Sequence, residues 1–138
     1  MPHATIVVPA FNVAATLHET LVSLLAQTFE DFEIVIVDDG SNDATSEIAK
    51  SFQYDPRVSI ISQRNRGLAG ARNSGIAAAK GDVIGFCDSD DIWEPSKLAA
   101  HVRHLQENQD VGVSYSGSAL IDDDSNDLGQ SQKPRLTS

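Results

Sequence analysis

The sequence predicts an α/β domain of three layers, in which helices cover both faces of a mostly parallel sheet. Short apolar runs rich in β-branched residues alternate along the chain with stretches of helical periodicity. One of these runs, residues 83–87, has no polar residues at alternate positions, which is typical of a parallel strand buried on both faces. The length of 138 residues suits one domain with a hydrophobic core.

The expected strands are short and mainly apolar. The first of them stops at Pro9, because proline has no N–H to donate to a sheet. Alternation of these strands with helices predicts that neighbouring strands run parallel. In chain order the strands cover residues 5–8, 32–37, 58–61, 83–87 and 111–115.

Four helices are expected between these strands. Thr16 and Glu19 have the spacing of a capping box, and a stripe of leucines at positions 17, 21, 24 and 25 follows. The remaining helix signals are Asn42 or Asp43 as the N-cap of a helix over about 44–52, Gly81 as the C′ residue after 67–80, and Pro95 as the first residue of the fourth helix.

The charge of the chain argues against several kinds of partner. The formal net charge is −10. No basic patch is available to replace the counterions of nucleic-acid phosphates, so we expect no binding to nucleic acid. An electrostatic hold on anionic lipid is disfavoured for the same reason. An acidic chain that binds a phosphorylated ligand needs a metal ion or a local arginine as counter-charge.

The single cysteine, Cys87, lies in an apolar run, where we expect a small buried hydrophobic residue. No disulfide can form within the chain, which suits the cytoplasm or the cytoplasmic face of a membrane. No apolar stretch approaches the ~20 residues of a membrane span. The N-terminus lacks the pattern of a signal peptide. We therefore expect a cytoplasmic protein with no transmembrane segment in this chain.

The strongest functional signal is the acidic cluster of Asp88, Asp90 and Asp91, which follows the strand expected at 83–87. A carboxylate at the end of a buried strand costs free energy unless it is paired, solvated or bound to a cation. Two aspartates separated by one residue can both reach one divalent ion, and Mg2+ and Mn2+ prefer oxygen ligands. A solvated loop that caps the next helix is the alternative.

Two more strand ends are expected at the same edge of the sheet. Asp38 and Asp39 follow the second strand, and Pro9, Ala10 and Phe11 follow the first. Ligands of open α/β sheets bind at the carboxyl ends of the strands. Phe11 could stack on a base, and an aspartate could accept a hydrogen bond from a base N–H or a ribose hydroxyl. An ordinary Asp-Gly turn is the alternative for the acidic pair.

Arg72 is expected on or beside the buried face of the third helix. A guanidinium that points inward needs an anionic partner. Asp38, Asp39 or a ligand phosphate could serve, and a structural ion pair is the alternative. The positions that mark this face are Leu68, Ala71, Gly75, Ile76 and Ala79.

Five segments, taken together, resemble the nucleotide-sugar-binding half of family 2 glycosyltransferases, which have the GT-A fold. The resemblance covers roughly residues 4–118. No single motif is specific, but all five occur in the order and spacing of the family. They are IVVPAFN at 6–12, SLLAQTF at 23–29, EIVIVDDGS at 33–41, NRGLAGARNSG at 65–75, and FCDSDD with WEP over 86–95.

This resemblance implies a Rossmann-like nucleotide-diphospho-sugar transferase fold and a donor site. Asp88 and Asp90 would hold Mg2+ or Mn2+ on the diphosphate of the donor, with Asp90 as the more direct ligand. Asp39 would meet the base, commonly uracil. The nucleotide-sugar-binding residues implied in full are Pro9, Ala10, Phe11, Asp39, Arg72, Asp88 and Ser89.

The implied activity is transfer of a sugar from a UDP-sugar to a hydroxyl of a carbohydrate or lipid-linked acceptor, with inversion at the anomeric carbon, as in polysaccharide biosynthesis. Two features depart from the family pattern. Phe11 replaces the usual tyrosine, so a hydroxyl is lost. Residues 121–138 are too short to supply the acceptor-binding half, and the catalytic base is expected downstream. We expect a donor-binding domain at 1–120 and an acidic, polar tail at 121–138, which starts the acceptor region or is disordered.

Two other functions fit parts of the pattern. A non-catalytic nucleotide-sugar-binding or regulatory module would bind its ligand with metal and show no turnover. A phospho-acceptor receiver domain also has an acidic pair beside a parallel strand. In receiver domains that pair follows the first strand, whereas Asp38 and Asp39 follow the second.

Overall fold

The computed structural model describes residues 2–108, 118–121 and 127–132. The chain divides into two compact units, one up to Ala99 and one from Ala100 onward. The helix α4 (Lys97–Glu107) includes residues on both sides of this division. Within the described residues, no helix is long and apolar enough to cross a membrane.

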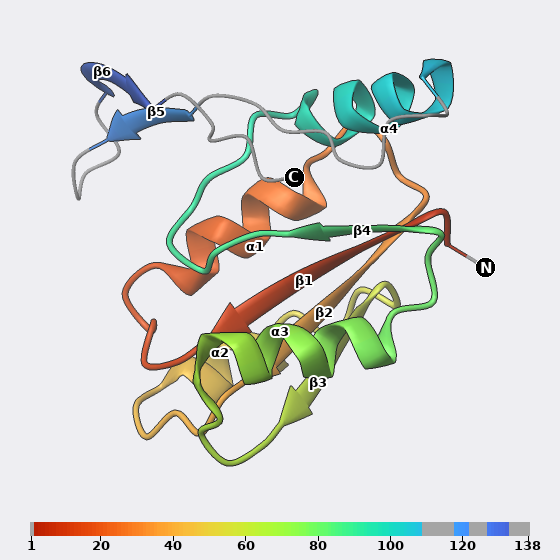
Figure 1. Ribbon diagram of the computed structural model, residues 1–138. Coiled ribbons are helices and arrows are strands. Elements are labelled where there is room, and N and C mark those ends of the chain that lie inside the picture. Colours follow the sequence, from red (N-terminus) through yellow and green to blue (C-terminus); the bar gives the residue numbers. More distant parts are fainter. Residues whose placement is uncertain (1, 109–117, 122–126, 133–138) are drawn as a thin grey trace. The chain divides into compact units, whose positions relative to one another are not determined.

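The first unit is built on a four-stranded parallel sheet, as the sequence predicts (Figure 1). Its strands lie in the order β3-β2-β1-β4, with β1 and β2 in the middle. Ala10 of β1 pairs with Asp38 of β2, so both strands end at the same edge. The strands are β1 (Ala4–Ala10), β2 (Phe32–Asp38), β3 (Val58–Ser62) and β4 (Val83–Phe86).

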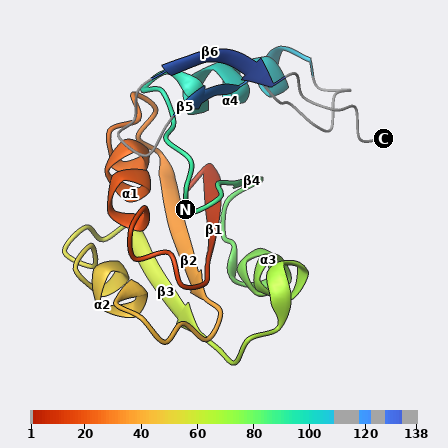
Figure 2. The same cartoon turned by 90° about the vertical axis from the view of Figure 1, so that its left-hand side faces the viewer.

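Helices cover both faces of this sheet, which confirms the expected three layers (Figure 2). The helices α1 (Leu17–Leu25) and α2 (Thr45–Lys50) lie on one face, and α3 (Gly67–Ala78) lies on the other. Every residue of β1 is buried, and β2 is buried except at the half-buried Glu33. Two-sided burial explains why these strands are continuous apolar runs rather than alternating ones.

Pro9 does not end β1, although the sequence analysis placed the end there. Val7 offers its carbonyl to the N–H of Cys87, so residues 5, 7 and 9 turn their backbone groups toward β4. The pairing of β4 with β1 ends at Val7 and Phe86. The missing N–H of Pro9 therefore removes no bond from the sheet.

The strand β4 corrects the expectation of burial on both faces. It is the edge strand of the described sheet, and its residues alternate between half-buried and exposed. Ile84 is 38% exposed and Phe86 is 42% exposed. An apolar composition alone cannot distinguish an edge strand from a covered one. The fifth strand, expected at 111–115, lies outside the described residues.

The helix α3 buries less of its surface than expected. Ala71 and Gly75 are buried, whereas Leu68 and Ile76 are exposed. A Cβ on Gly75 would lie 2.3 Å from the Cγ1 of Val7, so the glycine lets the helix pack directly on β1. Small residues, rather than the large apolar ones, thus mark the face of α3 that meets the sheet.

The expected ends of α1 and α3 also differ in the structure. Thr16 makes no side-chain cap bond at α1, because its hydroxyl donates to Ser89 O at 2.9 Å instead. The helix α3 ends at Ala78, and Ala79 is extended, so Gly81 is not its C′ residue. Gly81 instead lets the backbone before β4 pass close to that of β1, because a Cβ there would lie 2.6 Å from the carbonyl carbon of Ala4.

In the second unit, β5 (Ser118–Ile121) pairs antiparallel with β6 (Asp127–Gln132). The sequence analysis expected no strand in either segment. Residues 127–132 read DLGQSQ and contain one large apolar residue, so no period of two was visible. The division into a donor-binding domain at 1–120 and a tail at 121–138 stays a prediction.

Candidate nucleotide-sugar site

The carboxyl ends of β1, β2 and β4 line a single open cavity of about 380 Å3 in the first unit. This volume is within the range of small-molecule pockets. Six of the seven residues implied as nucleotide-sugar-binding line it, together with Asp90. The seventh, Arg72, is not among the lining residues. The complete lining is Pro9, Ala10, Phe11, Val13, Asp39, Asn65, Gly67, Leu68, Ala71, Asp88, Ser89 and Asp90.

Asp39 is buried at one side of this cavity, with 3% of its surface exposed. Its Oδ1 accepts two hydrogen bonds, from Gln63 Nε2 at 2.9 Å and from the backbone N–H of Arg66 at 2.8 Å. Its own N–H donates to Ala10 O at 2.9 Å. The carboxylate is therefore restrained, and among the described residues its second oxygen, Oδ2, has no hydrogen-bond donor, so it can accept one from a ligand.

Asp38 shapes the turn that follows β2 and does not line the cavity. Its Oδ1 accepts the N–H of Ser41, three residues further on, at 3.0 Å, so this side chain stabilises the turn that contains Gly40. Gly40 in this turn has a φ of +84°, and a Cβ there would lie 2.8 Å from the N of Asn65. The turn can thus pack against the loop that carries Asn65.

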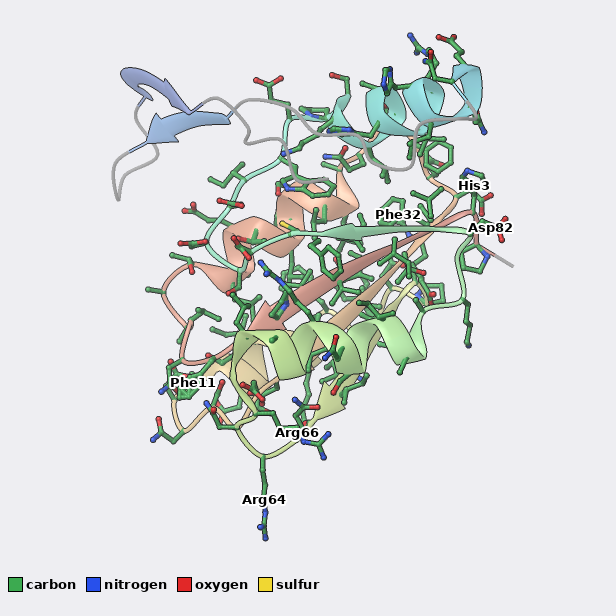
Figure 3. The ribbon with its side chains drawn as sticks, viewed as in Figure 1. His3, Phe11, Phe32, Arg64, Arg66 and Asp82 are labelled. Carbon is green, nitrogen blue, oxygen red and sulfur yellow. The ribbon has the colours of Figure 1, made fainter. Side chains whose placement is uncertain are left out.

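Phe11 is 43% exposed and stands on a loop that is tied to the loop after β2. Asn12 has a φ of 51°, a left-handed conformation that asparagine tolerates better than most residues. Its N–H donates to Ser41 Oγ and its Oδ1 accepts the N–H of Asn42, both at 3.0 Å. Figure 3 places Phe11 at the carboxyl end of β1, with Arg64 and Arg66 on the loop before α3.

Asp88 and Asp90 form the acidic side of the cavity, and Asp91, which does not line it, completes a group of three carboxylates. One carboxylate oxygen from each lies within 4.8 Å of the others, and all three residues are exposed. Partial desolvation by the surrounding protein raises the pKa of Asp91. The negative charges of Asp88 and Asp90 raise this pKa further, and the positive charge of Lys97 offsets part of the effect. Three carboxylates with oxygen atoms this close carry more negative charge than Arg72 and Lys97 balance, and they fit a hard divalent cation. Asp91 is a third candidate ligand beside the expected Asp88 and Asp90.

Arg72 contacts this acidic group rather than the pair after β2. Its Nη2 lies 3.5 Å from Asp88 Oδ1, and its guanidinium lies 5.7 Å from the centre of the Phe86 ring. Its Nε is buried and has no described hydrogen-bond partner. Asp38 and Asp39, which were two of the possible partners named beside a ligand phosphate, bond to other groups. Arg72 therefore adds positive charge beside the acidic cluster.

Hydrogen bonds from α1 and its N-cap residue fix the position of the acidic loop. Thr16 and Thr20 both donate their hydroxyls to the carbonyl oxygen of Ser89, at 2.9 and 3.0 Å. Ser89 is buried, with 6% of its surface exposed. The backbone between Asp88 and Asp90 is thereby fixed relative to the core. The sequence analysis missed this role, because it assigned Thr16 to a helix cap.

Two further residues of α1 and its end bind the segment after the acidic loop. Ser23 Oγ accepts the N–H of Trp93 at 3.1 Å. Gln27 donates to Glu94 O at 2.8 Å and accepts the N–H of Leu98 at 3.0 Å. The positions 16, 20, 23 and 27 share one helical face, so this polar stripe satisfies backbone groups that would otherwise be unpaired.

Cys87 is buried directly before the acidic loop, as expected for a small hydrophobic residue. Burial raises the pKa of its thiol, and the nearby Asp91 carboxylate raises it further. Nucleophilic attack requires a thiolate. Burial and the raised pKa both fit Cys87 as a packing residue.

Two residues at the site, Gln63 and Arg66, were not expected from the sequence, and Asp91 was placed in the acidic cluster but not among the metal ligands. Gln63 follows β3 directly, at the same edge of the sheet as the expected site. Because β3 was predicted, the position of Gln63 directly after it could have marked this residue as a candidate for the site. The hydrogen bond from the Arg66 N–H to Asp39 could not be predicted from the sequence, because any residue except proline supplies the same backbone donor.

Comparisons with known proteins agree on a family. The family model described as "Glycosyl transferase family 2" matches residues 5–134. An uncharacterized glycosyltransferase of Nostoc sp. is 38% identical over 136 residues, which are 96% of this chain and 42% of that protein. The Escherichia coli protein UDP-Glc:alpha-D-GlcNAc-diphosphoundecaprenol beta-1,3-glucosyltransferase WfaP is 37% identical over 116 residues, which are 84% of this chain and 46% of the relative.

Solved structures with the same fold include two complexes with a nucleotide sugar. Staphylococcus aureus TarS 1-349 in complex with UDP-GlcNAc superposes with a TM-score of 0.74 at 25% identity, over 88% of this chain and 40% of TarS 1-349. The mannosyltransferase PcManGT from Pyrobaculum calidifontis, in complex with GDP-Man and Mn2+, superposes with a TM-score of 0.72 at 25% identity, over 88% of this chain and 36% of the enzyme. These likenesses confirm the expected GT-A fold. The chain spans less than half the length of each of these four proteins.

Proposed function

This chain belongs to glycosyl transferase family 2, and we propose that it binds the UDP-sugar donor of a metal-dependent glycosyl transfer reaction. The observation that carries the proposal is that Asp39 and the acidic group of Asp88 and Asp90 line one cavity. A nucleoside diphosphate has a base at one end and two phosphates at the other. Asp39 suits the base as a hydrogen-bond acceptor, and Asp88 and Asp90 suit the diphosphate as ligands of a bridging metal ion.

The base binds between Phe11 and Asp39. Phe11 offers an exposed ring for stacking, which contributes about 1–3 kcal/mol per base in other nucleotide sites. Asp39 offers its free Oδ2 as an acceptor for the N–H at position 3 of uracil. A solved relative with this fold, TarS, binds UDP-GlcNAc, which supports uracil as the base.

The diphosphate binds at the acidic side through a divalent ion, Mg2+ or Mn2+, which Asp88 and Asp90 hold. The phosphates are anionic, so Asp88 and Asp90 repel them without a bridging cation. The bound ion would stabilise the negative charge that develops on the leaving diphosphate. Arg72 adds a second positive charge beside Asp88. The complex of the mannosyltransferase PcManGT with Mn2+ supports a metal at this site.

The sugar is transferred to an acceptor hydroxyl with inversion at the anomeric carbon. The family relatives are longer than this chain, and we expect the catalytic base in the part that they have in addition. The name of the E. coli relative WfaP describes a lipid-linked diphosphate acceptor. We propose a carbohydrate or lipid-linked acceptor of the same general kind, met at the cytoplasmic face of a membrane.

Calorimetric titration of the purified chain with UDP tests the donor site. With Mn2+ we expect saturable binding, and with EDTA in place of the metal the affinity should fall at least about tenfold. The variant Asp90→Ala should lose the metal effect. Asp82→Ala is the matched control, because Asp82 is an exposed aspartate at the other end of β4 (Figure 3). Equal affinity for UDP with and without metal would contradict the proposal.

A further inference from the structure

A hydrogen-bonded chain of three side chains leads from α3 to the base side of the cavity. Ser74 donates its hydroxyl to Gln63 Oε1 at 2.6 Å, and Gln63 Nε2 donates to Asp39 Oδ1 at 2.9 Å. The Ser74 hydroxyl also lies 3.1 Å from Gly70 O, within its own helix. Only Asp39, the last member of the chain, lines the cavity.

The hydrogen bonds that link Ser74, Gln63 and Asp39 all run in one direction, with each donor on the side of Ser74 and each acceptor on the side of Asp39. The amide of Gln63 must turn its NH2 group toward the carboxylate, because its oxygen would be repelled there. Ser74 then satisfies the amide oxygen on the other side. The backbone N–H of Gln63 donates to Asp38 O at 3.0 Å, which fixes the main chain of Gln63 beside β2.

Within the part of the chain that the structure describes, Asp39 Oδ1 accepts two hydrogen bonds and Oδ2 accepts none. The second donor is the N–H of Arg66, at 2.8 Å. Both donors restrain the carboxylate of a residue that lines the cavity, and an ionised carboxylate oxygen can act only as an acceptor. A ligand group opposite Oδ2 must then be a donor, because an acceptor would be left unpaired against a buried carboxylate.

We propose that Gln63 and Ser74 are positioning residues that set the choice of base. They hold Asp39 so that the site accepts a base with a ring N–H, such as uracil, and rejects one without it. The inference rests on the proposed function, since it assumes that Asp39 meets the base. It goes further in assigning base selectivity to two residues that do not touch the nucleotide.

The test compares UDP with its N3-methyl derivative, which lacks the ring N–H and keeps the ribose, the diphosphate and most of the base. Affinity for both is measured by calorimetry on the full chain with Mn2+. The readout is the ratio of the two affinities, because a general loss of structure would weaken both ligands together. For the wild-type chain we expect UDP to bind about 10- to 100-fold more tightly, as for a hydrogen bond to a charged group.

The variant Gln63→Leu should lower this ratio about tenfold, and Ser74→Ala should lower it about threefold. Ser74→Ala is the milder change and covers the case in which Gln63→Leu does not fold. Circular dichroism and a cooperative thermal transition confirm that each variant is folded. The matched control is Gln53→Leu, because Gln53 is exposed and precedes β3 on a separate loop.

A double-mutant cycle with Asp39→Ala separates positioning from general stability. In the Asp39→Ala background, Gln63→Leu should leave the ratio unchanged, because no polar side chain remains at position 39 for Gln63 to orient. An unchanged ratio in both Gln63→Leu and Ser74→Ala would overturn the inference and leave the proposed function standing. Failure of the wild-type chain to bind UDP with Mn2+ would contradict the proposed function and the inference together.

Discussion

Thr20 donates its hydroxyl to the carbonyl oxygen of Ser89, 3.0 Å away and 69 residues further along the chain. Thr20 is fully buried, and it lies one turn after Thr16, which donates to the same carbonyl. The loop that carries the acidic cluster is therefore fixed from the core side by α1. Asp88 and Asp90 line the cavity, and the backbone between them is fixed by the hydrogen bonds of Thr16 and Thr20 to the Ser89 carbonyl.

Replacing Thr20 by valine removes one of these donors and keeps the shape of the side chain. We expect Thr20→Val to lower the free energy of unfolding by about 1 kcal/mol, measured by urea denaturation. Because the acidic loop loses an anchor, Mn2+-dependent binding of UDP should weaken as well. The matched control is Thr28→Val, at an exposed threonine just after α1. Equal losses in both variants would show that the Ser89 contact has no special part in the site.

Phe11 offers the exposed ring of the cavity, and its contribution can be measured directly. Phe11→Ala should weaken UDP binding about tenfold or more, since it removes a stacking surface. Phe11→Tyr should keep the affinity, because the ring remains and only a hydroxyl is added. Tyr54→Ala is the control, at an aromatic residue that is 76% exposed after α2. Retained affinity in Phe11→Ala would mean that the base lies elsewhere in the cavity.

The ion pair of Asp55 and Arg57 predicts part of the pH dependence of stability. The Arg57 guanidinium, which bonds Asp55 Oδ2 at 2.9 Å, lowers the pKa of that carboxyl below its ordinary value of 3.8. The folded state therefore favours the ionised form. The stabilisation is fully present above pH 3.8 and is lost as the pH falls through the lowered pKa of the folded state.

At neutral pH, Asp55→Asn should cost about 1 kcal/mol in the free energy of unfolding, and this cost should shrink as the pH is lowered below 3.8. The comparison uses denaturation curves of both proteins over a pH series. Asp31→Asn serves as control, at an exposed aspartate with no described side-chain hydrogen bond. A cost that is constant with pH would show that the ion pair is not its cause.

The sheet and its functional edge were predictable from the sequence because both depend on local patterns. Apolar runs fixed the positions of β1, β2, β3 and β4, and the end of each run located the polar residues that follow it. Asp39, Asp88 and Asp90 were therefore assigned correctly to one edge. Parallel strands bring their carboxyl ends together whatever the details of packing.

The contacts that hold the site were not predictable in this way. Thr20 and Ser89 are separated by 69 residues, and Gln63 and Asp39 by 24, so no local spacing links them. The exposure of β4 was also hidden, because composition does not say whether a neighbour covers a strand. Arg72 was rightly expected to need an anion, but its partner, Asp88, depends on the packing of α3.

The central claim is that the base and the diphosphate occupy opposite sides of one cavity, and comparison of uridine with UDP tests it most directly. Calorimetry with and without Mn2+ gives four affinities for the wild-type chain. Mn2+ should raise the affinity for UDP at least about tenfold and leave that for uridine unchanged, because only the diphosphate reaches the acidic side. Asp39→Asn should weaken both ligands with or without metal. An equal effect of Mn2+ on uridine and UDP would contradict the account.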